Sequence, residues 1–397
     1  MAHYDTDDYD YDAAEELRRR KARARRKAEM RRKKKRRFYI RVALRLALYV
    51  LILVAIITGI VLGIKKIISL VRENTDDAGD NKYQAQTEEL TEEVPTQVVD
   101  FTDVESHPAE EETFMGSEGK IYSATASDAV TGFPEGVASQ YGIFIDLETG
   151  LILEQQEPKT KMFPASMTKI LTCLVAAEHL TEAQLDDTFI MTPEINYYAY
   201  KNDCSTVGFS DDEEVTVRDL LYGTILPSGG DAAVGLATYI AGSHEDFVVM
   251  MNEKLEELGL SETTHFTNCV GLYDDDHYST CYDMAMIMEA CMDNELCREV
   301  MHAHTYTTSS TTQHPDGITV SNWFLRRIED HVSGGEVYAA KTGFVNESGN
   351  CAVSYGIDSS GHEYICATGN STSSWKCIKD HVAIYQTVFP TESSTAE

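Results

Sequence analysis

Basic residues are scarce in most of this chain. Beyond residue 72, the 397-residue sequence has only 14 Lys and Arg against 57 Asp and Glu, whereas the other 20 of its 34 basic residues come earlier. Binding to nucleic acid depends on contacts from Lys and Arg to phosphates. The composition therefore excludes a nucleic-acid partner for the chain beyond residue 72, and it disfavours docking on other anionic polymers.

Signatures of metal binding are missing as well. The sequence has no Cys-x-x-Cys pair and no His-Glu-x-x-His run, the spacings that hold zinc in structural sites and in metallopeptidases. The run DDDH at residues 274–277 could suggest a metal site, but we favour a solvated turn. We predict neither a metal ion nor a cofactor.

The nine cysteines match neither a zinc ribbon nor a small disulfide scaffold, and an odd number cannot all pair within one chain. We interpret them as small buried apolar residues. Cys351 and Cys366 could meet diagonally across a predicted hairpin, and the sequence leaves that pairing open.

One long apolar run is present near the N-terminus. Residues 46–64 contain no charge and are flanked on both sides by Arg or Lys. A helix of this length spans the hydrocarbon core of a bilayer, and the basic block before it favours a cytoplasmic N-terminus. A buried core helix and a cleaved signal peptide are the alternatives, which the flanking charges and the lack of a cleavage site disfavour. We expect a single-pass cell-membrane anchor with the rest of the chain extracytoplasmic.

Changes in composition divide the chain into four predicted segments. These are a disordered basic cytoplasmic tail (1–40), a transmembrane helix (41–67), an acidic flexible linker (68–125) and a folded domain (126–392).

The folded segment mixes the two kinds of secondary structure. Apolar runs around residues 148–150 and 358–361 predict two hairpins. Helices are expected at 166–180, 215–226, 231–240, 245–258, 283–301 and 374–389. Strands first, then helices, then strands and a last helix indicate an α+β domain whose N- and C-terminal pieces share one sheet.

A Ser-x-x-Lys run is the first candidate for chemistry. It occurs three times, beginning at Ser117, Ser166 and Ser373, but only Ser166 opens a long apolar helix after a turn. Ser166 and Lys169 then share one face of that helix, whose N-terminus favours an oxyanion. Burial would favour the neutral amine of Lys169, which can accept the serine proton. An N-capping serine beside an incidental lysine is the alternative.

The run Lys341-Thr342-Gly343 is the second candidate. It occurs once, just before the last hairpin, so we expect it on an edge strand facing the helix that carries Ser166. Lys341 can hold a carboxylate or assist proton transfer, Thr342 can donate a hydroxyl hydrogen bond, and Gly343 lets a substrate backbone approach. An ordinary strand start is the alternative.

Taken in order, several runs resemble the D-alanyl-D-alanine carboxypeptidases among the low-molecular-mass penicillin-binding proteins. They are PASMTK, LLYGTILPSGGDAA, MNEKLEELGL, HFTN followed by GL, HYST followed by YDMA, and KTG. The resemblance covers about residues 125–392 and implies a β-lactamase/transpeptidase-like fold, a helical lobe packed on an antiparallel sheet. It implies removal of the terminal D-Ala of peptidoglycan stem peptides through an acyl-enzyme, with β-lactam antibiotics as inhibitors.

The resemblance also implies a role for each matching residue. Ser166 would be the nucleophile, Lys169 its base, and Ser228 a relay that passes a proton to the leaving amine. The backbone N–H groups of Ser166 and Phe344 would form the oxyanion hole. The residues implied to bind substrate are Lys341, Thr342, Gly343, Phe344 and Gly230.

Position 230 departs from the family pattern. The middle motif is usually Ser-x-Asn, and here glycine replaces the asparagine. Loss of one positioned donor costs about 10²- to 10³-fold in rate at comparable sites. Water, or Asp231 after a loop shift, could partly replace the amide.

Two other functions compete with the carboxypeptidase. A β-lactamase is disfavoured because no Glu-x-x-Leu-Asn run lies between Ser228 and Lys341. A catalytically weak or inactive module of the same fold, serving cell-wall binding or scaffolding, has Gly230 as its only support.

Overall fold

The computed structural model describes residues 120–389. The predicted tail, the predicted membrane helix, most of the predicted linker and residues 390–392 lie outside the described residues. None of the helices within the described part has the length and apolar character needed to cross a bilayer. In the last residues of the predicted linker, Tyr122 is buried and its hydroxyl donates a 2.9 Å hydrogen bond to Asp293.

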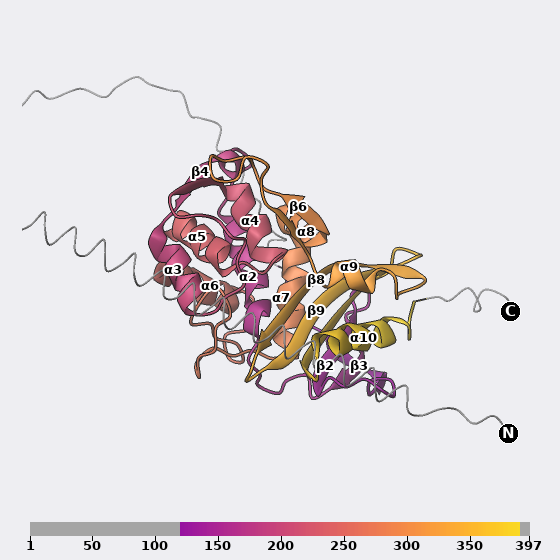
Figure 1. The fold of residues 1–397 in the computed structure, drawn as a ribbon. Coiled ribbons are helices and arrows are strands. Elements are labelled where there is room, and N and C mark those ends of the chain that lie inside the picture. Colours follow the sequence, from indigo (N-terminus) through magenta and orange to yellow (C-terminus); the bar gives the residue numbers. More distant parts are fainter. Residues whose placement is uncertain (1–119, 390–397) are drawn as a thin grey trace, which may run out of the picture. The chain divides into compact units, whose positions relative to one another are not determined.

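A six-stranded sheet forms one half of this domain (Figure 1). Its strands, in spatial order, are β1 (Thr125–Thr131), β3 (Leu151–Gln156), β2 (Tyr141–Asp146), β10 (Glu363–Ser371), β9 (Gly349–Asp358) and β8 (Gly335–Val345).

Pairing within the sheet confirms most of the predicted topology. Both predicted hairpins form, and β2 pairs with β10, so the N- and C-terminal pieces do share one sheet. The expectation of a wholly antiparallel sheet is wrong at one edge. There β1 runs parallel to β3. After β1 the chain forms β2 one strand position away, and β3 then returns antiparallel to β2 in the position between β1 and β2.

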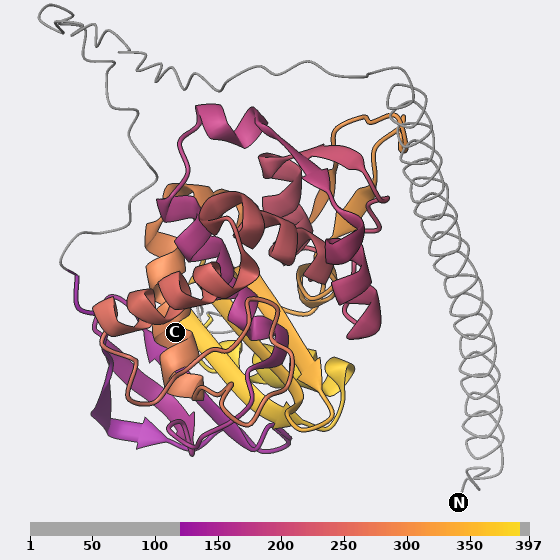
Figure 2. The ribbon, with the colours of Figure 1, turned by 90° about the vertical axis from the view of Figure 1, so that its left-hand side faces the viewer.

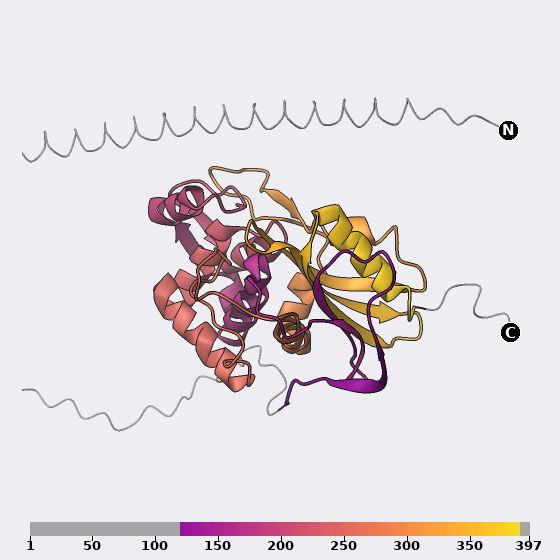
Figure 3. The ribbon, with the colours of Figure 1, turned by 90° about the horizontal axis from the view of Figure 1, so that it is seen from below.

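Helices cover both faces of the sheet because strand side chains point alternately to opposite sides. On one face, α9 (Leu325–Ile328) and α10 (Ser374–Tyr385) close a core that includes Phe144 and Tyr385. On the other face, α7 (Cys281–Asp293) and α8 (Glu295–His302) join the sheet to the helical lobe (Figure 3).

The helical lobe lies beside the sheet (Figure 2). It contains η1 (Ala165–Thr168), α2 (Lys169–Glu178), η2 (Ala183–Asp186), α3 (Pro193–Lys201), α4 (Val217–Ile225), α5 (Gly230–Ala241) and α6 (His244–Glu257). Two small ribbons complete the domain: β4 (Thr188–Met191) with β5 (Glu213–Thr216), and β6 (Thr305–Thr307) with β7 (Thr319–Ser321).

Three predicted helices need correction. The helix expected at 166–180 begins with the 3₁₀ turn η1, and that expected at 215–226 begins only after β5 ends at Thr216. The helix expected at 283–301 is in fact two helices. The side chain of Asn294 accepts a 3.0 Å hydrogen bond from Cys297 N and so caps a new helix at that point.

The cysteines are mostly core residues, as predicted. All nine are free thiols, and every one except Cys204 is buried. Cys366 pairs in register with Ser354, an odd number of residues from Cys351, so the side chains of Cys351 and Cys366 point to opposite faces of the sheet. The diagonal pairing that the sequence left open is therefore excluded in this fold.

Candidate active site

A pocket of about 360 Å³ lies where η1 meets the outer edge of β8. Six of the residues singled out in the sequence line it: Ser166, Lys169, Ser228, Thr342, Gly343 and Phe344. Lys341 lines a smaller neighbouring pocket of about 230 Å³, which shares Ser228 and Thr342 with the first. Gly230 lines neither of these two pockets.

Close packing against β8 places Ser166. The preceding residue, Ala165, has a φ of 49°, a left-handed conformation that turns the chain sharply into η1. A Cβ on Gly343 would lie 2.6 Å from the carbonyl oxygen of Pro164. Glycine at 343 is therefore what allows the edge strand to reach the turn that carries Ser166, and it brings the backbone of Phe344 to the same pocket.

Lys169 faces Ser166 across one turn of helix. Its Nζ lies 3.1 Å from Ser166 Oγ and donates a 2.6 Å hydrogen bond to the carbonyl oxygen of Val270. The side chain is fully buried, and this burial lowers the pKa of Lys169 to about 8. A lysine with this pKa has a neutral fraction near neutral pH, and that form can accept the proton of Ser166.

The loop of Val270 holds the lysine in place. Asn268 Oδ1 accepts hydrogen bonds from the backbone N–H groups of Val270, Gly271 and Leu272, which fixes the turn. Gly271 has a φ of 81°, and a Cβ there would lie 1.9 Å from the carbonyl oxygen of Ala165. Asn268 and Gly271 belong to the HFTN and GL runs that carry the family resemblance, but neither residue was assigned a role in the site from the sequence.

Ser228 supplies a second serine hydroxyl to the site. It lies at the turn before α5 with a φ of 59°, and its Oγ accepts a 2.8 Å hydrogen bond from Lys341 Nζ. Lys341 also donates to the carbonyl oxygen of Thr342. Burial, and then the nearby charge of Lys169, lower the pKa of Lys341. Because Ser228 accepts from Lys341, its own O–H is available to donate into the pocket.

Asp231 is not a substitute for the missing amide at position 230. Its carboxylate accepts hydrogen bonds of 3.0 Å from the N–H groups of both Val207 and Gly208, and a third of 2.9 Å from Ala232 N. These bonds tie the loop after α3 to the start of α5. In this arrangement the backbone occupies the carboxylate, so Asp231 could serve substrate only after the loop shift considered from the sequence.

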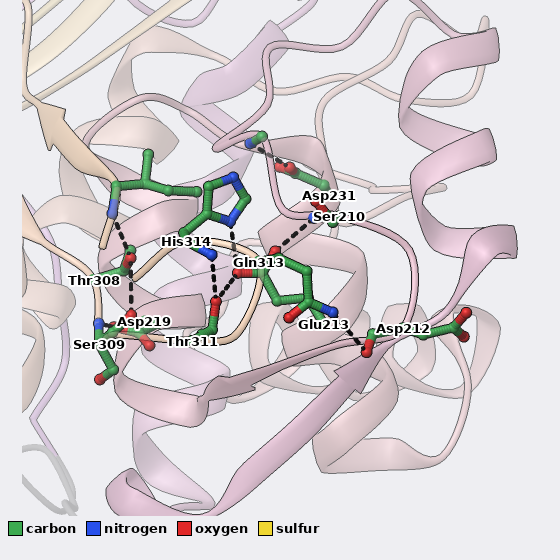
Figure 4. Close-up of polar contacts among 12 residues, drawn as sticks. Ser210, Asp212, Glu213, Asp219, Asp231, Thr308, Ser309, Thr311, Gln313 and His314 are labelled. Atoms are coloured by element: carbon green, nitrogen blue, oxygen red, sulfur yellow. Dashed lines mark hydrogen bonds and ion pairs between the residues drawn. The ribbon is translucent and has the colours of Figure 1, made fainter. Parts of the chain in front are cut away.

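Two more carboxylates anchor the segment between β6 and β7 to the helical lobe (Figure 4). Glu213 accepts hydrogen bonds from the side chains of Thr311 and His314, at 2.6 and 2.7 Å. Asp219 accepts from Ser309 N and from the hydroxyl of Tyr306, at 3.0 and 2.8 Å. This segment leads through β7 to Trp323, which lines the pocket.

The interpretation of residues 274–277 as a solvated turn is wrong for His277. Asp274, Asp275 and Asp276 are exposed, but His277 is buried and its Nε2 lies 2.8 Å from Thr168 Oγ1. Burial lowers the pKa of His277 to about 3, so the imidazole is neutral. Through its contact with Thr168, the buried imidazole supports η1 on the side facing the protein interior. No cluster of His, Cys, Asp or Glu suited to a metal ion occurs within residues 120–389.

Comparison with known proteins identifies the family of this fold and pocket. The family model described as D-alanyl-D-alanine carboxypeptidase, Peptidase_S11, matches residues 127–367. The chain belongs to this family. The match includes all of the pocket residues named above.

Among curated members of the family, the D-alanyl-D-alanine carboxypeptidase DacF of Bacillus subtilis is 37% identical over 183 residues, which are 46% of this chain and 43% of that protein. The D-alanyl-D-alanine carboxypeptidase of Streptomyces sp. strain K15 is 32% identical over 206 residues, 50% of this chain and 69% of that protein. This chain thus spans less than half of the length of DacF.

Solved structures agree on the fold. The Streptomyces K15 DD-transpeptidase superposes with a TM-score of 0.58 at 28% identity, over 64% of this chain and 97% of that structure. The D-alanyl-D-alanine carboxypeptidase of Mycobacterium tuberculosis superposes with a TM-score of 0.55 at 25% identity, over 64% of this chain and 91% of that structure. The β-lactamase/transpeptidase-like, α+β architecture expected from the sequence is therefore confirmed for the described domain.

Proposed function

We propose that this chain is a serine D-Ala-D-Ala carboxypeptidase that trims peptidoglycan stem peptides. The observation that carries the proposal is the pair formed by Ser166 and the buried Lys169, which share a pocket with Ser228. A nucleophile, a base of lowered pKa and a second hydroxyl are what serine acylation needs.

In the proposed reaction, Ser166 Oγ attacks the carbonyl carbon of the penultimate D-Ala while its proton passes to Lys169 Nζ. The N–H groups of Ser166 and Phe344 stabilise the resulting oxyanion. The C–N bond then breaks, and the leaving D-Ala nitrogen takes a proton through Ser228. Water hydrolyses the Ser166 ester and regenerates the enzyme.

Binding of the substrate carboxylate falls to Lys341 and Thr342. A carboxylate near Lys341 would favour its charged form and so raise its pKa from the lowered value of the ligand-free pocket. Gly343 would contribute through its backbone on β8, because the space that a Cβ would occupy there is taken by the turn before Ser166 and by Cys351. β-Lactam antibiotics, which acylate the same nucleophile, would act as inhibitors.

The cellular setting is also a proposal. The apolar run at residues 46–64, preceded by the basic block, supports a single-pass anchor in the cell membrane. With the N-terminus in the cytoplasm, the acidic linker would hold the folded domain outside, where peptidoglycan stem peptides are found.

Labelling with a fluorescent penicillin tests the proposal. We expect the wild type to form a covalent adduct and to release D-Ala from a D-Ala-D-Ala peptide, and Ser166→Ala to do neither. Ser210→Ala, outside the pocket, is the matched control and should react like the wild type. A wild type that binds no penicillin covalently would favour the scaffolding role instead.

A further inference from the structure

The space beside Gly230 is filled from another part of the chain. A Cβ built on Gly230 would lie 2.7 Å from the Cβ of Cys204 and 3.0 Å from its Sγ. Real side chains essentially never approach so closely, so a side chain at 230 and the present position of Cys204 exclude one another. The side chain of Cys204 can therefore occupy its present position only because residue 230 is glycine.

Backbone contacts fix the cysteine in that position. At the end of α3, Asp203 has a φ of 55°, and the N–H of Cys204 donates a 3.0 Å hydrogen bond to the carbonyl oxygen of Ala199. The N–H of Gly230 in turn donates to the carbonyl oxygen of Ser205, at 2.7 Å. Together with the bonds from Asp231 to the next residues of the loop, these contacts clamp residue 204 against the start of α5.

The thiol belongs to the pocket. Cys204 lines it together with Ser166, Lys169 and Ser228, and it is the one partly exposed thiol among the nine cysteines, all of which lie in the described residues. Burial raises the pKa of Cys204, so the group is a neutral thiol that can both donate and accept weak hydrogen bonds. The charge of Lys169 acts on Cys204 in the opposite direction, which places the two groups within electrostatic reach of each other.

We propose that Cys204 is a positioning residue of the active site, whose side chain takes the place left open by glycine at 230. Its Sγ orients Lys169 and the incoming substrate carbonyl, as a side chain at 230 would do in relatives with Ser-x-Asn. This inference rests on the proposed serine acylation. It also removes the only support for an inactive scaffold, because the site is then complete with Gly230.

Exchanging the two positions tests the inference. The rate of Ser166 acylation by fluorescent penicillin is measured in wild type, Cys204→Ala, Cys204→Ser, Cys204→Gly, Gly230→Asn and the double variant Cys204→Gly/Gly230→Asn. We expect Cys204→Ala to acylate about 10- to 100-fold more slowly, less than the loss of a full amide donor costs, and Cys204→Ser to be slowed less. Gly230→Asn should lose activity because its Cβ meets Cys204.

The acylation rate of the double variant distinguishes a positioning role of Cys204 from a purely structural one. With Cys204→Gly the space opens, so adding Gly230→Asn should raise the acylation rate above that of Cys204→Gly alone, although the same change is harmful in the wild type. Thermal unfolding of each variant checks that the domain remains folded. Wild-type rates in Cys204→Ala, or a double variant no faster than Cys204→Gly, would overturn the inference.

Alkylation of the thiol provides a second test. N-ethylmaleimide should reach Cys204 before the buried thiols and slow acylation in the wild type, and it should leave the rate of Cys204→Ser unchanged. Acylation at full rate by a protein that mass spectrometry shows to be alkylated at Cys204 also overturns the inference. If the untreated wild type forms no penicillin adduct at all, it is the proposed function that fails.

Discussion

Lys341 Nζ donates a 2.8 Å hydrogen bond to Ser228 Oγ, although 113 residues separate the two along the chain. The contact joins the edge strand β8 to the turn before α5, and so connects the sheet with the helical lobe. With Lys341 as the donor, the O–H of Ser228 is available to donate elsewhere. The leaving amine of a bound substrate is the acceptor that the proposed reaction offers.

Ser228→Ala should slow acylation by about 10²- to 10⁴-fold, the usual contribution of a positioned proton-transfer group. Stopped-flow measurement of the penicillin adduct, with D-Ala release from a peptide as a second assay, checks this. Ser210→Ala is again the control. If Ser228→Ala acylates as fast as the wild type, Ser228 is not the relay.

Acylation should depend on pH through Lys169. Because burial lowers the pKa of this lysine to about 8, the neutral base becomes scarcer below that pH. The acylation rate should fall by about tenfold per pH unit below pH 8 and level off above it. Lys169→Arg, which stays charged at every accessible pH, should be nearly inactive throughout. A rate that is flat from pH 6 to 9 would contradict Lys169 as the base.

Gly343→Ala should damage both stability and activity. The new Cβ would meet Pro164 O at 2.6 Å and Cys351 Sγ at 2.7 Å, forcing β8 away from η1. Such overpacking costs about 1–3 kcal/mol. We expect a lower midpoint of thermal unfolding and at least tenfold slower acylation. Gly132→Ala, where a Cβ meets nothing within 4 Å, is the matched control and should change neither.

The buried carboxylate of Asp380 should make stability depend on pH. It accepts hydrogen bonds from Ser139 N and Ser139 Oγ, which attach the chain before β2 to α10. Burial alone would raise the pKa of Asp380, but the hydrogen bonds outweigh it and the pKa is lowered. The stabilisation is therefore present above the unfolded-state pKa of about 4 and is lost as the pH falls through the lower folded-state value.

Asp380→Asn should accordingly reduce the free energy of unfolding at pH 7 by about 1–3 kcal/mol, since a buried donor loses its charged acceptor. Urea unfolding at pH 7 and pH 3 measures it, and the difference from wild type should shrink at pH 3. Glu253→Gln on the exposed side of α6 is the control. An equal difference at both pH values would contradict the assignment.

Local patterns were enough to predict the hairpins, most helices and the edge-strand position of Lys341, since each depends on short-range periodicity. The break at Asn294 was missed because apolar spacing continues across it, and only the cap marks the new helix. Roles for the predicted site residues follow from the family resemblance, and the structure adds their placement in two adjoining pockets.

The sequence by itself determined the class of this protein: ordered motifs, an acidic domain and an N-terminal apolar run are properties of the linear chain. Only the tertiary structure decided what Gly230 means. Position 204 lies 26 residues earlier with no periodic relation to it, and steric exclusion between the two exists only once the loop after α3 is packed on α5. Contacts of that kind depend on atoms that the chain brings together by folding, so no local pattern encodes them.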